Sequence, residues 1–243
     1  MNNKVIIFKT HIWNDNIEMY VNKIMDDISF IKIDFYVLMH DENDKIYNLI
    51  KSDFIRKKTL TFNENTIKRI YDIGFYSMWS SNHWILMWFF KQNKIYDYYW
   101  SIEYDVSIVG NSNIIWTDSS DYDLIYPLNY NNTPFHWTDH YIGGKLSIDQ
   151  RYHGYLQISR YSKIFLEYLD TCFMSGENGQ DELIIFSLAI RGQFKISNVL
   201  LKKKIRGQWS WKNQYSYVNT KIRDRLLLLQ NDENIVHILH PVK

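Results

Sequence analysis

The chain has 243 residues, of which 46% are hydrophobic and 23% are charged, and its formal net charge is +1. That length suits one globular domain, and the apolar content excludes a disordered chain. The single cysteine, Cys172, excludes a disulfide-stapled secreted scaffold, and the near-zero charge argues against general binding to nucleic acid through its phosphates.

The first half of the chain alternates short apolar runs with segments of helical period. Strands of the buried type are predicted at residues 4–8, 34–39, 59–62 and 98–102. Helices are predicted at 14–28, at 43–51, from Asn63 or Asn65 through Tyr71, and at 83–91. This order predicts an α/β, Rossmann-like fold in which helices flank a mostly parallel central sheet. Ligands bind such sheets beyond the carboxyl ends of the strands, so the candidate binding loops follow Phe8, Met39, Phe62 and Ile102.

The second half is less regular and rich in aromatic residues. A strand inside long loops is predicted at 111–144, a further strand at 154–158, helices at 160–169 and 181–191, and extended chain at 194–201 and 208–217. The tail, 235–243, is apolar and then basic. The Tyr and Trp rings of this half could stack on sugars or simply fill a core. No linker rich in Pro, Gly or Ser divides the chain, so one domain, 1–243, is expected.

The sequence contains no candidate membrane span. Its most apolar stretch is seven residues long, from Trp84 to Phe90, whereas a bilayer span needs roughly 20. The N-terminus lacks the pattern of a signal peptide, because only the short apolar run 5–8 lies between Lys4 and Lys9. We therefore expect a cytoplasmic protein with no nucleic-acid partner, and a peripheral membrane contact stays open.

Two carboxylates follow the fourth predicted strand. Glu103 and Asp105 are spaced i, i+2, which on an extended backbone places both side chains on one face. Such a pair offers hard oxygen ligands suited to Mg²⁺ or Mn²⁺, especially when a diphosphate supplies further ligands. The same pair could act as general acid and base, or form an ion pair at a solvated strand end.

This segment resembles the acid-x-acid (DxD) motif of nucleotide-sugar-dependent glycosyltransferases with the GT-A fold, and here it reads Glu103-Tyr104-Asp105. The strings at 9–11, 100–106 and 160–162 also resemble a glycosyltransferase-like group found in eukaryotes, bacteria and large viruses. Glu103 departs from the pattern, since Asp is usual there, so the metal is placed more safely on Asp105. The resemblance implies one GT-A-like domain with a nucleotide-sugar-binding half, 1–110, and an acceptor-binding half, 111–243.

The resemblance further implies a divalent cation, Mn²⁺ or Mg²⁺, that neutralises the leaving diphosphate. Glu103 and Asp105 would hold this cation, and His240 near the end of the sequence would be a further ligand. The implied donor is a nucleoside diphosphate sugar, above all a UDP-sugar, which these two acids would bind together with Thr10, His11, Asp41 and Lys243. Thr10, His11 and Asp41 also fit ordinary turns. His237 lies among apolar residues and is expected to be structural.

Asp181 and Glu182 follow the loop 176–180 and open a predicted helix. In inverting members of the resembling family, an acid at such a junction deprotonates the acceptor hydroxyl, so these two residues are the implied catalytic base, with Asp181 preferred. Acids in the first turn also suit the positive end of a helix, which would be a purely structural role. The implied acceptor is a hydroxyl of a glycan, a glycolipid, a protein or a small molecule.

Two other classes of function stay open. A non-catalytic carbohydrate-binding module would use the aromatic surface and bind a free glycan without a nucleotide sugar. A metal-dependent nucleotidyl- or phosphotransferase would also need two carboxylates and a cation. Sequence patterns for a Cys-ligated zinc site, a P-loop or a nucleophile elbow are absent.

Overall fold

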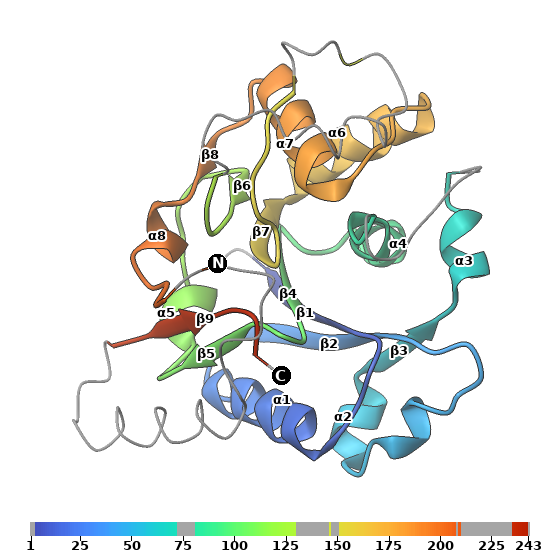
Figure 1. Cartoon of the computed structure of the whole chain (residues 1–243), viewed down its shortest axis with the longest axis vertical. Coiled ribbons are helices and arrows are strands. Elements are labelled where there is room, and N and C mark those ends of the chain that lie inside the picture. The colour runs from blue at the N-terminus through green and yellow to red at the C-terminus, as the bar shows by residue number, and fades with distance from the viewer. Residues whose placement is uncertain are drawn as a thin grey trace.

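A central sheet with helices on both faces organises the protein (Figure 1). The computed structural model describes residues 3–71, 81–129, 146, 151–207, 209 and 235–242. In this part of the chain, seven strands form one sheet in the order β3-β2-β1-β4-β7-β6-β8. Their bounds, in that order, are Thr59–Phe62, Ile33–His40, Lys4–Thr10, Tyr98–Glu103, Ile158–Ser162, Leu124–Ile125 and Ile196–Ser197.

The sheet is mostly parallel, as the sequence predicted. Strands β3, β2, β1 and β4 run parallel to one another, and β8 runs parallel to β6. Strand β7 is antiparallel to both of its neighbours, β4 and β6. A separate antiparallel pair joins β5 (Ser107–Val109) to β9 (His237–Leu239). The carboxyl ends of β1 and β4 therefore lie at the same edge of the sheet.

Helices cover the two faces of the sheet (Figure 1). Helix α1 (Asp15–Asp27) packs on one face together with α2 (Asp53–Lys57), and α4 (His83–Gln92), α6 (Lys163–Met174) and α7 (Asp181–Arg191) lie on the other. The shorter helices are α3 (Glu64–Lys68), α5 (Asn113–Trp116) and α8 (Val199–Lys202), with a 3-10 turn η1 (Tyr47–Leu49). No described helix combines the length and the apolar character that a bilayer span requires.

The alternation of side chains along β1 and β4 builds two apolar clusters. Val5, Ile7 and Tyr99 face α4, α6 and α7. Their chain neighbours Ile6 and Trp100 face α1 and α5 on the opposite side. Residues two or four positions apart on a strand point to the same face of the sheet. Lys9, two after Ile7, and Glu103, four after Tyr99, therefore point to the face covered by α4, α6 and α7.

Several predicted helices are confirmed, and capping side chains explain where two of them, α1 and α3, begin. Asn14 caps α1, since its side chain accepts hydrogen bonds from the backbone N–H groups of Asn16 and Ile17. Helices α4 and α7 lie where the apolar runs predicted them. Asn63, one of the two predicted caps, caps α3, but that helix ends at Lys68 rather than at Tyr71.

The helix predicted at 43–51 is wrong. The Asp41 carboxylate accepts hydrogen bonds from the backbone N–H groups of Asn43, Lys45 and Tyr47, at 3.3, 3.1 and 2.7 Å. A side chain that accepts hydrogen bonds from these backbone N–H groups stabilises a loop, because the same groups can then no longer bond within a helix. Only the turn η1 forms within the range, and the helix α2 begins afterwards with Ser52 as its cap.

The predictions for 154–158, 160–169 and 194–201 are displaced or partly wrong. The strand runs over Ile158–Ser162, because these residues pair with β4, and the helix α6 therefore starts at Lys163. Ser162 caps that helix by accepting from the Phe165 N–H at 3.1 Å. In the range 194–201, the short strand β8 is followed directly by the helix α8. Of the range 208–217, only Trp209 belongs to the described residues.

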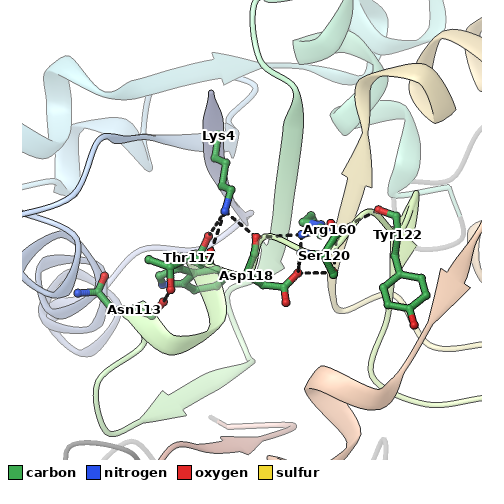
Figure 2. A network of polar contacts seen from close by, with 8 residues as sticks. Lys4, Asn113, Thr117, Asp118, Ser120, Tyr122 and Arg160 are labelled. Carbon is green, nitrogen blue, oxygen red and sulfur yellow. Dashed lines mark hydrogen bonds and ion pairs between the residues drawn. The ribbon is translucent and has the colours of Figure 1, made fainter. Parts of the chain in front are cut away.

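A fully buried arginine fastens β7 to the segment that leads into β6 (Figure 2). Arg160 forms a 2.6 Å ion pair with Asp118 and donates to the backbone carbonyls of Ser120 and Tyr122 at 2.7 and 2.9 Å. Lys4 reaches the same segment and donates to the carbonyls of Thr117 and Asp118. The Arg160 guanidinium also lies 4.3 Å from the centroid of the Tyr98 ring. Since Lys4 and Tyr98 begin their strands, this network lies at the amino end of β1 and β4.

Candidate active site

A cavity of about 520 Å³ lies at the carboxyl ends of β1 and β4. Side chains from β1, β4, the first turns of α4 and α7, and the segment after β9 surround it. Its lining residues are Lys9, Thr10, His11, His40, Asn82, Ile85, Glu103, Tyr104, Asp105, Gln157, Gln180, Asp181, Glu182, His240 and Pro241. The cavity thus occupies the edge of the sheet at which ligands of open α/β folds bind.

Glu103 and Lys9 form a pair across the two central strands. Lys9 is opposite Glu103 in the parallel register of β1 and β4, and its Nζ lies 3.6 Å from Glu103 Oε1. The Asn82 side chain, at the start of α4, donates to the same carboxylate oxygen at 2.5 Å. One cation and one amide therefore hold Glu103, so its carboxylate is already engaged by the protein.

Asp105 reaches the cavity from a turn. The strand β4 ends at Glu103, and the Val106 N–H bonds back to the Glu103 carbonyl, so the extended backbone assumed for the i, i+2 spacing stops between the two acids. Both acids nevertheless line the cavity. Burial, followed by the nearby charges of Asp105 and Glu103, raises the pKa of Tyr104 to about 12, so its phenol stays protonated.

His240 is brought to Asp105 by the pairing of β5 with β9. The Val242 N–H donates to the Asp105 carbonyl at 2.8 Å, and His240 Nε2 lies 3.7 Å from Asp105 Oδ2. His240 is buried and lines the cavity, whereas His237 lies within β9 opposite Val109 and is not a lining residue. The structure thus brings together two of the three predicted metal ligands as neighbours.

Asp181 and Glu182 open α7 and are both buried in the cavity wall. Asp181 Oδ1 accepts hydrogen bonds from the Gln180 side chain and the Glu182 backbone N–H, each at 2.8 Å. Glu182 Oε1 accepts a 2.5 Å bond from the side chain of Gln157. These amides fix the orientation of both carboxylates.

The ionisation of Asp181 is tuned to neutral pH. Burial is the main cause, and the Glu103 charge adds to it, while Lys9 opposes them, with the result that the pKa of Asp181 is raised to about 7. A carboxylate with a pKa near the working pH is suited to accept a proton from a hydroxyl and release it again.

This raised pKa predicts a pH-dependent stabilisation by Asp181→Asn. Native Asp181 keeps its proton up to about pH 7, whereas the unfolded chain loses it near 3.8, so the wild-type free energy of unfolding falls between these values. Asparagine does not ionise, so the variant does not show this decrease in the free energy of unfolding. Urea unfolding should show little difference between variant and wild type at pH 4 and a gain on the order of 2–4 kcal/mol for the variant at pH 8. An equal difference at both pH values would contradict the assignment.

The structure places only some of the other predicted donor-binding residues at the cavity. Thr10 and His11 line the cavity. Thr10 closes a turn by donating to the Ile12 carbonyl at 2.5 Å, and the His11 ring packs edge-on against Tyr104. Asp41 is not a lining residue, because its carboxylate is held by the loop described above. Lys243 lies outside the described residues.

Sequence reasoning missed several lining residues. His40, at the end of β2, lines the cavity in the place expected of Asp41, and its ring stacks on Phe62 at 5.6 Å. Gln157 and Gln180 were not predicted as site residues, and only their proximity to Ile158 and Asp181 in the sequence hinted at them. Lys9 was also missed, because its position opposite Glu103 follows only from the register of β1 and β4.

The donor set bears on the predicted cation. Among the residues that the structure describes, no three His, Cys, Asp or Glu side chains are grouped so as to hold a metal ion. Asp105 and His240 supply one oxygen and one nitrogen donor at neighbouring positions, and Glu103 is engaged by Lys9 and Asn82. These residues fit a cation that takes two ligands from the protein and the rest from a bound diphosphate.

No family model matches the sequence, and no curated protein matches it. Among solved structures, the galactosyltransferase LgtC with donor and acceptor sugar analogues has a TM-score of 0.43 and 13% identity, over 96% of this chain and 86% of that one. The bifunctional glycosyltransferase WbbM has a TM-score of 0.47 and 8% identity, over 82% and 39%. The inositol-1-phosphate CTP transferase of T. maritima has a TM-score of 0.47 and 5% identity, over 81% and 84%. With TM-scores below 0.5, these similarities carry no argument about function, which has to come from the cavity.

Proposed function

We propose that this protein is a glycosyltransferase that moves a sugar from a nucleoside diphosphate sugar to a hydroxyl of an acceptor. The observation that supports this most directly is the arrangement of the cavity. It places the Asp105–His240 pair and the Asp181–Glu182 pair around one space at the carboxyl edge of the sheet. The first pair suits a cation on a diphosphate, and the second suits the deprotonation of a hydroxyl.

The charge of the lining argues for a cation in the bound state. Four carboxyl groups, of which Asp181 is only partly ionised near neutral pH, and one lysine lie among the described lining residues. A diphosphate brought into this space would be repelled unless a further positive charge accompanied it. Asp105 and His240 would hold Mn²⁺ or Mg²⁺, and such an ion would supply neutralisation of the charge that develops on the leaving diphosphate.

The chain's own residues would then divide the remaining work. Thr10, His11 and His40 lie at the ends of β1 and β2, where hydroxyl and imidazole groups can bind the nucleoside and its phosphates. Asp181, with its pKa near neutrality, would accept the proton of the acceptor hydroxyl in an inverting reaction. Glu182 would orient that hydroxyl beside it. The donor expected is a UDP-sugar, and the acceptor is a glycan, a glycolipid or a protein.

A thermal-shift screen tests this proposal. Nucleoside diphosphate sugars with different bases would each be added with Mn²⁺ or with EDTA. We expect one donor to raise the melting temperature with Mn²⁺ only, since a ligand bound to the native state at 100 times its Kd contributes about 2.7 kcal/mol. Incubation of that donor with an acceptor should then release a nucleoside diphosphate and form a glycosylated product.

Other products would point elsewhere. Release of pyrophosphate would identify a nucleotidyltransferase, and a phosphorylated acceptor would identify a phosphotransferase. Stabilisation by free glycans, with no effect of any nucleotide sugar, would identify a carbohydrate-binding module. Each of these three results would overturn the proposal.

A further inference from the structure

Trp209 contacts the candidate metal ligand His240 with the face of its ring. The two rings stack with centroids 4.7 Å apart and an angle of 24° between their planes. Trp209 is not itself a lining residue, so it contacts the cavity only through its neighbours. A flat partner of this kind restricts the rotation of the imidazole and so fixes where its nitrogens point.

The indole N–H of the same ring makes a second connection. Trp209 Nε1 donates to Gln157 Oε1 at 3.1 Å, and Gln157 Nε2 donates in turn to Glu182 Oε1 at 2.5 Å. Because one amide cannot exchange its oxygen and nitrogen without breaking both bonds, the indole sets which end of Gln157 faces Glu182. Gln157 is buried, and its carbonyl accepts from the Glu103 N–H at 2.9 Å, so its backbone is anchored to β4.

We propose that Trp209 is a positioning residue that orients His240 through its ring face and Glu182 through Gln157. This inference rests on the proposed function, and it assigns separate tasks to two parts of one side chain. The ring face acts on the side of the cavity that would hold the cation and the donor diphosphate. The indole N–H acts on the side that would hold the acceptor hydroxyl.

Two substitutions at this position separate the two tasks. Trp209→Phe keeps an aromatic face for His240 and removes the donor to Gln157. We expect this variant to keep the donor KM and the Mn²⁺ requirement within about twofold of wild type and to lose roughly 10-fold in kcat, since misplacement of a reacting group costs rate. Trp209→Leu removes both contacts, so it should also raise the donor KM and the Mn²⁺ concentration needed for half-maximal rate.

Gln157→Met supplies an independent check on the same connection. It should reproduce the kinetics of Trp209→Phe, and the double variant should lose no more than either single one, because both remove one chain of hydrogen bonds. Trp116→Phe is the matched control, because it also removes an indole donor, to Ser112 Oγ at 2.8 Å, and Trp116 in α5 is not a lining residue. Equal losses in donor KM and kcat for Trp209→Phe, or additive losses in the double variant, would overturn the inference.

A spectroscopic measurement tests the connection without relying on catalysis. The indole N–H resonance of Trp209 can be assigned by its absence from the ¹H–¹⁵N spectrum of Trp209→Phe. It should move in Gln157→Met and in Glu182→Gln, and it should stay in place in the exposed control Asp53→Asn. If the resonance shifts but no donor is found, the contact stands and the proposed function fails. If donors bind but the resonance does not respond, the positioning role fails.

Discussion

Replacing Asp105 by asparagine is expected to reduce sugar transfer by about 10²–10³-fold, the usual cost of losing one group that stabilises developing charge. The substitution removes the carboxylate that lies 3.7 Å from His240 Nε2. Its backbone carbonyl still accepts from Val242, so the fold should be retained. Steady-state kinetics and calorimetric titration with the donor and Mn²⁺ would measure the effect.

Glu103→Gln is the matched comparison. Because Lys9 and Asn82 already engage the Glu103 carboxylate, we expect its replacement to weaken Mn²⁺-dependent donor binding much less than Asp105→Asn does. Unaltered donor affinity in Asp105→Asn, or a greater loss in Glu103→Gln, would remove Asp105 and His240 as the cation site.

Replacing Arg160 by methionine is expected to lower the free energy of unfolding by about 3–5 kcal/mol, as when one partner of a buried ion pair is removed. The guanidinium is fully buried and serves the Asp118 carboxylate and the carbonyls of Ser120 and Tyr122. Methionine fills part of the space, removes the cation that pairs with Asp118, and takes the Arg160 donors away from the carbonyls of Ser120 and Tyr122, while Asp118 keeps its bonds from Ser120. Urea unfolding followed by fluorescence would report the loss.

Arg56→Met serves as the control for this experiment. Arg56 pairs with Asp53 at 3.7 Å on the surface of α2, and such exposed pairs contribute about 0–1 kcal/mol. Comparable stability of Arg160→Met and Arg56→Met would show that the buried network contributes little to holding β7 against the segment before β6.

The elements that sequence predicted well are those whose signals are local. The apolar runs of β1 and α4, the Asn14 cap of α1 and the acids in the first turn of α7 need no knowledge of distant residues. The helix predicted at 43–51 was wrong because the Asp41 side chain accepts hydrogen bonds from backbone N–H groups that a helix would use. The spacing of apolar residues carries no information about such a competing side chain. The helix predicted from residue 160 was wrong over residues 160–162. These residues form part of β7, because they pair with β4, which is distant in the sequence.

The residues of the candidate site likewise differ in whether the sequence could predict them. Asp105 was predicted from its place after an apolar strand, Asp181, Glu182 and His240 were implied by the resemblance to glycosyltransferases, and all four line the cavity. The roles of Lys9 and Gln157 depend on strand register and on amide partners, which no spacing within the sequence encodes. The engagement of Glu103 by Lys9 could therefore be found only from the aligned strands.

The two ends of β1 carry different chemistry, with the Arg160 and Lys4 contacts at one end and the cavity at the other. Amino-acid changes at the cavity therefore leave the Arg160 and Lys4 contacts intact. A library randomised at His11 and His40 should contain mostly well-folded members. This edge of the sheet is thus a favourable starting place for directed evolution toward new donors, because selection there would act on recognition before it acted on folding.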